Sequence, residues 1–195
     1  MDKLISSISR STEPSLSWSI EHLSMRNYKL IGPLDLDREE GLLTRASLKM
    51  TKWRNDDWDC ACEANGCYVF GLRRGDKITP WYVGMTHEQA VWDEATSQRN
   101  LGIYNQVLRE RAGYPVLCLL ARLTPTGRAV YRDLKSEIEK VEFLLIGAAL
   151  DENPDLMNVK ESQFLSELVI PGWFGAGRGK PSHAAVAFAR MLGFE

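Results

Sequence analysis

The chain has 195 residues, of which 44% are hydrophobic and 26% are charged, and its formal net charge is −2. These values are those of an ordinary globular protein, and they exclude a chain that is basic throughout and binds nucleic acid by overall charge. The longest apolar run, FLLIGAAL, is far too short to span a bilayer, and no apolar leader follows Met1. We therefore expect a cytoplasmic protein that does not enter a membrane, with its four cysteines as free thiols.

Residues 1–60 are predicted to form an N-terminal extension. The first 19 residues are rich in Ser and Thr without apolar periodicity, which indicates a mobile arm. Residues 28–36 (YKLIGPLDL) predict a short strand interrupted by Gly32-Pro33, and residues 37–50 predict a helix with an acidic start. The connector that follows carries Trp53 and Trp58, and we interpret this region as one that either braces the domain or contacts a protein partner.

Residues 66–86 predict a β-hairpin. Two apolar segments, GCYVFGL and PWYVGM, flank a polar connector that contains Arg73, Arg74 and Gly75. Alternation places Cys67, Val69 and Gly71 on one face of the first strand and Tyr68, Phe70 and Leu72 on the other. Each strand carries a tyrosine close to a glycine, and a glycine in a strand lets another group approach the backbone closely.

The remaining elements complete a central domain over residues 61–165. Residues 89–111 predict one or two helices interrupted near residues 100–102, and the apolar run 116–123 predicts a central strand. Residues 133–150 predict a long helix that Asn153-Pro154 ends. The predicted fold is α/β, with a small, mostly antiparallel three-stranded sheet flanked by helices and extended at both termini.

Residues 166–195 are predicted to form a basic, glycine-rich tail and a C-terminal helix capped by Ser182. The segment GAGRGK contains Arg178 and Lys180 but lacks the spacing of a nucleotide-binding phosphate loop. A basic strap across a nucleic-acid backbone fits this composition better, with Trp173 and Phe174 as stacking or anchoring residues.

Charge is unevenly distributed along the chain. Residues 97–135 contain seven basic and two acidic residues, whereas residues 137–167 contain two basic and eight acidic ones. This distribution suits an anionic ligand held beside a cation-binding carboxylate, although solvated helix faces produce similar runs.

Glu142 stands out in the long predicted helix. It lies within the apolar stripe, between Ile138 and Ile146, whereas Glu137, Glu139 and Lys140 fall outside it. A carboxylate there must be paired, neutralised or bound to a metal, because an isolated buried charge is very unfavourable. The alternatives are a side chain that extends to water or meets an arginine, and an oxygen ligand for Mg²⁺.

Four elements in this order resemble the signature of the GIY-YIG nuclease family. Gly66-Cys67-Tyr68 and Tyr82-Val83-Gly84 are similar to its two triplets, with Cys and Val in place of the isoleucines. The family's helical glutamate motif is matched by Glu142-Phe143-Leu144-Leu145-Ile146, and its later asparagine by Asn158. The resemblance covers residues 66–160, about half of the chain.

The resemblance implies an endonuclease that hydrolyses phosphodiester bonds with one divalent ion, Mg²⁺ or Mn²⁺. Glu142 would bind the metal, Tyr68 would orient or deprotonate the attacking water, and Tyr82 would hydrogen-bond water or phosphate. Asn158 would complete the catalytic set. The implied substrate is nucleic acid, and we favour DNA over RNA.

The family's usual arginine is not at its expected position, which Trp92 occupies. Arg99 is the first cationic residue downstream and is predicted to take the catalytic arginine's place. Further basic residues are predicted to bind the substrate: Arg73, Arg74, Arg109, Arg111, Arg178 and Lys180.

Several alternatives remain open on the sequence alone. A catalytically impaired module of the same fold would bind nucleic acid or a protein partner, and a purely structural protein would leave Glu142 unexplained. His87 could act as the base in place of Tyr68. Cys60 and Cys62 could hold zinc with Cys67 or a histidine, but their spacing is not that of a zinc knuckle.

Overall fold

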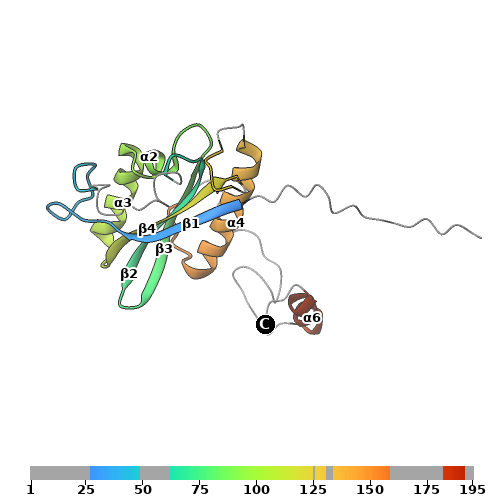
Figure 1. The fold of residues 1–195 in the computed structure, drawn as a ribbon. Helices are drawn as coiled ribbons and strands as arrows, with labels where there is room; N and C mark the ends of the chain where they lie inside the picture. Colours follow the sequence, from blue (N-terminus) through green and yellow to red (C-terminus); the bar gives the residue numbers. More distant parts are fainter. Residues whose placement is uncertain (1–26, 49–61, 125, 131–133, 159–181, 192–195) are drawn as a thin grey trace, which may run out of the picture.

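The computed structural model describes residues 27–48, 62–124, 126–130, 134–158 and 182–191 (Figure 1). Its centre is an antiparallel sheet of four strands in the order β1-β4-β2-β3. The strands are β1 (Asn27–Asp35), β2 (Gly66–Arg74), β3 (Lys77–Thr86) and β4 (Tyr114–Leu123). The predicted α/β class, the hairpin and the antiparallel sheet are confirmed. The predicted number of three strands is wrong, because β1 pairs along β4 as a fourth strand.

The described helices are α2 (Val91–Ala95), α3 (Gln98–Glu110), α4 (Lys135–Glu152) and α6 (His183–Met191). Helices α2 and α3 lie on one face of the sheet and α4 on the other (Figure 1). The predicted alternation in β2 is confirmed, since Tyr68 and Phe70 pack in the core on the α3 side. On the other face, Val69 packs with Ile146 of α4, and the Cys67 thiol contacts the Ile138 carbonyl at 3.7 Å.

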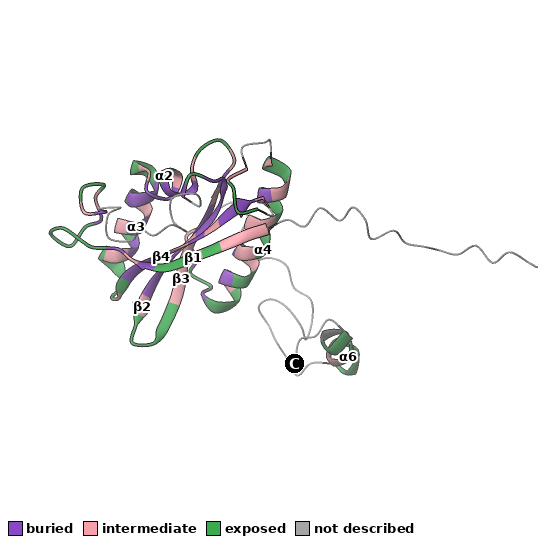
Figure 2. Cartoon of the chain, viewed as in Figure 1, coloured by how far each residue is buried: buried purple, intermediate pink, exposed green. Residues whose placement is uncertain are grey.

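The main core lies between the sheet and α2–α3, and the interior strands β2 and β4 are buried through most of their length (Figure 2). Residues from every described element of this face contribute to it, including Leu36, Leu43, Tyr68, Phe70, Trp92, Leu101, Tyr104, Leu117 and Leu119. The smaller core under α4 contains Val83, Ile146, Ala149 and Leu156. The predicted central strand 116–123 is confirmed by its interior place in the sheet.

The helix predicted over residues 37–50 is wrong over its described part. Residues 37–48 form turns, and Glu39 and Leu42 pair as an isolated bridge. Glu40 and Gly41 have φ values of 51° and 83°, which are left-handed conformations that interrupt a helix. Leu43 is buried, and its backbone N–H and carbonyl are both bound by the Asn105 side chain of α3. Tertiary contacts, rather than helical hydrogen bonds, therefore fix this segment.

The two helices predicted within residues 89–111 are present, but the break lies at Thr96-Ser97 and not at residues 100–102. The Thr96 hydroxyl donates to the Trp92 carbonyl at 2.7 Å, and the Ser97 hydroxyl accepts from the Asn100 N–H to cap α3. Residues 100–102 lie inside the first turns of α3. The ends of α4 at Glu152 and of α6 at Met191 agree with the predicted helices to within about two residues.

The segment after α4 covers the outer edge of β3. Asn153 donates from its side chain to the Pro80 carbonyl at 2.7 Å, and the Met157 N–H donates to the Trp81 carbonyl at 2.9 Å. The Asn158 amide bonds both the N–H and the carbonyl of Val83. The backbone around Tyr82 is therefore held from both sides of the strand, by β2 and by this segment.

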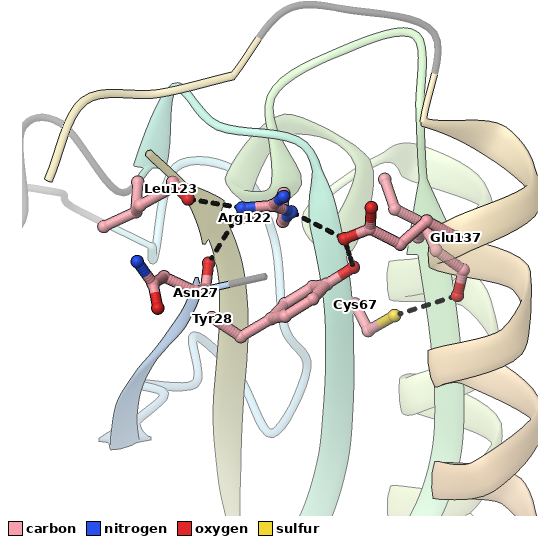
Figure 3. Close-up of polar contacts among 7 residues, drawn as sticks. Asn27, Tyr28, Cys67, Arg122, Leu123 and Glu137 are labelled. Carbon is pink, nitrogen blue, oxygen red and sulfur yellow. Dashed lines mark hydrogen bonds and ion pairs between the residues drawn. The ribbon is translucent and has the colours of Figure 1, made fainter. Parts of the chain in front are cut away.

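A polar cluster missed by the sequence analysis links α4 to β4 and β1 (Figure 3). Arg122 is 9% exposed, and its Nε donates to the Glu137 carboxylate at 2.6 Å. The Arg122 guanidinium also bonds the Leu123 carbonyl and lies 5.7 Å from the centre of the Tyr28 ring, whose hydroxyl donates to Glu137. Burial and the charge of Glu137 raise the pKa of Tyr28 well above its usual range.

We expect Arg122→Met to lower the free energy of unfolding by about 2–3 kcal/mol, measured by urea denaturation, because the half-buried Glu137 carboxylate would lose the Arg122 guanidinium. The double variant Arg122→Met/Glu137→Leu should recover most of this loss, since it removes both charges. A double variant less stable than Arg122→Met would contradict the role of the pair.

Some predicted features lie outside the described residues. They are the mobile arm, the connector with Trp53, Trp58 and Cys60, and the tail with Trp173, Phe174, Arg178 and Lys180. Within the described ranges, none of the helices combines the length and the apolar character needed to cross a bilayer.

Candidate active site at the edge strand

The two tyrosines of the predicted triplets lie next to each other on the α3 face of the sheet. Tyr82 of β3 pairs with Phe70 in the strand register, two residues from Tyr68 along β2, and the Tyr68 and Tyr82 ring centres are 6.3 Å apart. A bulge between Phe70 and Gly71 leaves Trp81 without a register partner, directly before Tyr82. The structure therefore brings together the two phenols that the sequence singled out.

The glycines of both triplets have identifiable steric roles. A Cβ on Gly84 would lie 2.3 Å from both Cζ and the hydroxyl oxygen of Tyr68, so the Tyr68 ring crosses the edge strand where no side chain stands. A Cβ on Gly66 would lie 1.9 Å from the Leu120 carbonyl oxygen, so this glycine allows β2 and β4 to approach. Gly84 thus lets the Tyr68 phenol reach the edge of the sheet.

Glu142 lies on the side of α4 that faces the sheet. It stands one helical turn from Ile138 and one from Ile146, both of which are fully buried, whereas Glu142 itself is half-buried. Its carboxylate acts on the pKa of Cys67, Tyr68 and Tyr82, which places it within electrostatic reach of both phenols. The predicted position of Glu142 inside the apolar stripe is confirmed.

Asn100 is a site residue that the sequence analysis missed. It is 1% exposed, and its amide nitrogen lies 2.7 Å from the Tyr68 hydroxyl oxygen and 2.6 Å from the Glu94 carbonyl oxygen. It also lies 3.3 Å from the Glu94 carboxylate. The sequence offered no signal, because an asparagine in the first turn after a capping serine is an ordinary helix start.

Burial sets the ionisation of the two phenols. Burial raises the pKa of Tyr68 well above its usual range, and Tyr82, Glu94 and Glu142 raise it further against the Asn100 hydrogen bond. Burial also raises the pKa of Tyr82, but there the Arg99 guanidinium and the Tyr68 hydroxyl oppose the carboxylates. Tyr68 is therefore the phenol that stays protonated, and Tyr82 has the more favourable surroundings for a negative charge.

The predicted arginines differ in their surroundings. Trp92 occupies the position where the nuclease family usually has an arginine. It is 5% exposed and packs in the main core, and no cation stands at this position. Arg99 is exposed in the first turn of α3, and its charge lowers the pKa of Tyr82. Arg111 pairs with Asp155 at 3.1 Å and stacks over Trp81. Arg109 is exposed near the end of α3, about 15 Å along the helix from Arg99.

The hairpin arginines lie away from the phenols. Arg73 forms an ion pair with Asp35 at 2.6 Å, and Arg74 donates to the Ala112 carbonyl at 2.5 Å. Arg73 is five residues from Tyr68 along β2, which is about 16 Å in a strand. These two residues therefore face a different end of the sheet, and Arg178 and Lys180 lie outside the described residues.

Asn158 supports the site through the backbone. Its amide accepts from the Val83 N–H at 2.9 Å and donates to the Val83 carbonyl at 2.7 Å, and its side chain is buried. Val83 stands between Tyr82 and Gly84, so Asn158 fixes the strand segment that carries the site. In this arrangement the amide holds protein backbone and acts as a positioning group.

Tyr104 of α3 completes the aromatic group around the phenols. Its ring stacks on Phe70 with 4.1 Å between ring centres and meets Tyr82 edge-on at 6.1 Å. Among the described residues, its fully buried hydroxyl has no hydrogen-bond partner. Its pKa is raised by burial first and then by Tyr68, Tyr82 and Glu94.

We expect Tyr104→Phe to raise the free energy of unfolding by about 1 kcal/mol in urea denaturation, because it removes a buried hydroxyl without a partner. Tyr28→Phe is the matched control, since the Tyr28 hydroxyl donates to Glu137 at 3.2 Å and its loss should lower stability. A less stable Tyr104→Phe variant would show that this hydroxyl has a partner in solution.

The buried thiol of Cys67 should make the protein less stable at alkaline pH. Burial first, and then Glu142, raises the pKa of Cys67 to about 12 from its usual value of 9.0. Above about pH 9 the unfolded chain therefore binds fewer protons than the folded one, and the free energy of unfolding falls as pH rises towards 12, by up to about 1.4 kcal/mol per pH unit. Urea denaturation between pH 8 and 11 should show this fall, and Cys67→Ala should reduce it. A wild-type stability that rises over this interval would contradict the prediction.

The predicted zinc alternative finds no support among the described residues. Cys62, Cys67 and Cys118 form no disulfide, and Cys60 lies outside the described ranges. In the described part, no group of three or more His, Cys, Asp or Glu side chains could hold a metal. A metal held at the edge strand would thus depend on few carboxylates together with water and substrate.

No family model, curated protein or solved structure matches the chain.

Proposed function

We propose that the protein is a divalent-metal-dependent endonuclease of the GIY-YIG type that hydrolyses phosphodiester bonds of nucleic acid. One juxtaposition carries this proposal. Tyr68 and Tyr82, from adjoining strands, have ring centres 6.3 Å apart, and the charge of Glu142, on α4 at the opposite face of the sheet, acts on both phenols. Gly84, where the Tyr68 ring crosses β3, is the third residue of the second triplet.

The residues present fit a single Mg²⁺ or Mn²⁺ ion. Magnesium commonly takes one or two protein carboxylates and completes its shell with water and substrate phosphate. Glu142 is half-buried and would hold the ion, and the half-buried Glu94 lies on the other side of the phenols. When bound, the ion would supply Lewis-acid stabilisation of charge on the phosphate oxygens.

The chain's own groups have distinct parts in this proposal. Arg99 is exposed and its charge acts on Tyr82, so its guanidinium would bind the scissile phosphate. Tyr82 would hydrogen-bond water or phosphate. Tyr68 keeps its proton at neutral pH, so it serves as a hydrogen-bonding group in place of the base that the sequence analysis considered.

The substrate class follows from the chemistry of the site. One cation beside a phenol and a metal-binding carboxylate suits a phosphodiester anion. The net charge of −2 means that nucleic acid would be held by local basic groups, among which Arg109 and the tail residues Arg178 and Lys180 are candidates. We propose DNA as the substrate, with RNA as the comparison in the assay.

The assay is incubation of the full chain with supercoiled plasmid, single-stranded DNA and RNA, each with Mg²⁺, Mn²⁺ or EDTA. We expect nicking or linearisation of DNA that needs the divalent ion and is lost in Tyr82→Phe. Absence of cleavage from every substrate and metal would reject the endonuclease.

A second candidate function is a binding module of the same fold with an impaired site. Two observations favour it: Trp92 fills the core at the expected arginine position, and Tyr68 is only 1% exposed. In that case a gel shift on DNA should tighten at low salt without cleavage. The absence of any shift would direct the search to a protein partner, for which residues 1–60 were the predicted contact.

A further inference from the structure

We propose that Asn100 and Tyr68 form a buried hydrogen-bonded pair that positions Tyr82, and that Tyr82 is the phenol that contacts the attacking water or the phosphate. The substrate in this inference rests on the proposed function, whereas the hydrogen bonds and the burial of the pair are present in the folded chain without substrate. In this inference Tyr68 positions its neighbour, and Tyr82 contacts the substrate.

Accessibility separates the two tyrosines. Tyr68 is 1% exposed, and its ring is enclosed between Gly84 of the edge strand and the α3 side of the core. Tyr82 is half-buried, and the charge of the exposed Arg99 lowers its pKa. A phosphate oxygen can therefore approach Tyr82, whereas Tyr68 can act only through a neighbour.

The direction of the Asn100 hydrogen bond is fixed by Glu94. The same end of the Asn100 amide lies 2.6 Å from the Glu94 backbone carbonyl and 3.3 Å from its carboxylate. Both of these groups only accept hydrogen bonds, so the end that faces them must be the NH₂ group. The Tyr68 oxygen, 2.7 Å from the same nitrogen, is consequently an acceptor.

A phenol that accepts from Asn100 still carries one proton of its own. Its aromatic neighbour across the strand pair is Tyr82, and the Tyr68 hydroxyl lowers the pKa of Tyr82. Donation from the Asn100 amide leaves the Tyr68 proton free to point towards Tyr82, whose ring centre lies 6.3 Å from that of Tyr68. A hydrogen bond donated by Tyr68 would stabilise negative charge on the Tyr82 oxygen, which could at the same time accept a hydrogen bond from water.

The charged groups around the pair come from each packed element. Glu94 of α2 and Glu142 of α4 disfavour ionisation of both phenols, and the protonated Tyr104 of α3 borders Tyr82 edge-on. Arg99 is the cation that acts on Tyr82. A metal ion at Glu142 would neutralise one of the opposing charges, so ionisation of Tyr82 should become easier when the ion is bound.

The test is tyrosine ¹³Cζ NMR of the full chain through a pH titration, with Tyr68 and Tyr82 assigned by their Phe variants. Asn100→Leu should raise the Tyr82 pKa by about half a unit or more, because Tyr68 is no longer held as a donor. Asn100→Gln keeps an amide donor and should move the Tyr82 pKa less. Asn105→Leu is the matched control, since Asn105 lies on the same helix but bonds the Leu43 backbone, and it should leave Tyr82 unchanged.

Tyr68→Phe gives a second route if Asn100→Leu fails to fold. It should also raise the Tyr82 pKa, and in the plasmid assay it should slow cleavage about tenfold, while Tyr82→Phe slows it at least tenfold more. The inference is overturned if the Tyr82 titration is the same in wild type, Asn100→Leu and Tyr68→Phe, or if Tyr68→Phe is the more damaging change. Because the titration needs no substrate, it decides the pairing even if the wild-type chain cleaves nothing.

Discussion

Glu142→Gln should lower the rate of divalent-metal-dependent DNA cleavage at least a hundredfold, to about the background of the assay. Glutamine keeps the shape of the side chain but removes the charge that would hold the ion. Because Glu142 raises the pKa of both Tyr68 and Tyr82, the variant should also lower the Tyr82 pKa in the metal-free protein. Plasmid cleavage under single-turnover conditions and the tyrosine titration measure the two effects separately.

Glu139→Gln is the matched control for this prediction. Glu139 is an exposed acid on the same helix, three residues before Glu142. The Glu139→Gln variant should therefore cleave DNA at the wild-type rate. Cleavage by Glu142→Gln within a few-fold of wild type would show that this carboxylate does not hold the ion. Equal losses in both variants would point to the overall charge of α4 instead.

Gly84→Ala should lower the free energy of unfolding by about 3 kcal/mol and reduce cleavage at least tenfold. The added methyl group would lie 2.3 Å from the Tyr68 ring end and its hydroxyl, so the ring or the edge strand must move. That movement would separate Tyr68 from Asn100 and from Tyr82. Urea denaturation measures the stability, and the Tyr68 ¹³Cζ shift reports the displacement.

Gly102→Ala is the control for the glycine effect. Gly102 is an exposed helical glycine, and a Cβ there meets nothing within 4 Å. Alanine should therefore stabilise the protein by about 0.5–1 kcal/mol through its helix propensity. A Gly84→Ala variant with wild-type stability and an unshifted Tyr68 signal would be incompatible with a ring that crosses the strand at Gly84.

The sequence predicted the parts of the fold that local patterns determine. Alternation in residues 66–74 assigned Tyr68 and Val69 to opposite faces, and the structure packs them in different cores. The 3.6-residue period placed Glu142 between two buried isoleucines on α4. The polar, turn-forming connector between two apolar segments predicted one hairpin, and hairpin strands bring Tyr68 and Tyr82 together without any long-range contact.

The features that were predicted wrongly or missed depend on contacts between segments that are distant in the sequence. Residues 37–48 have a helical composition, but two left-handed residues and the Asn105 side chain hold them as turns. The fourth strand required knowing that β1 pairs with β4 far along the chain. Two further pairs also leave no periodic trace in the sequence: Asn100 with Tyr68, 32 residues apart, and Arg122 of β4 with Glu137 of α4.

Paramagnetic broadening by Mn²⁺ is the most direct measurement of a shared site for the two phenols and the carboxylate. In the ¹³Cζ-tyrosine spectrum of the full chain, substoichiometric Mn²⁺ should broaden Tyr82 and Tyr68 before Tyr28 and Tyr114, and Glu142→Gln should abolish this selectivity. Uniform broadening of all tyrosines, or selective broadening that persists in Glu142→Gln, would contradict a metal site built on Glu142 beside Tyr82.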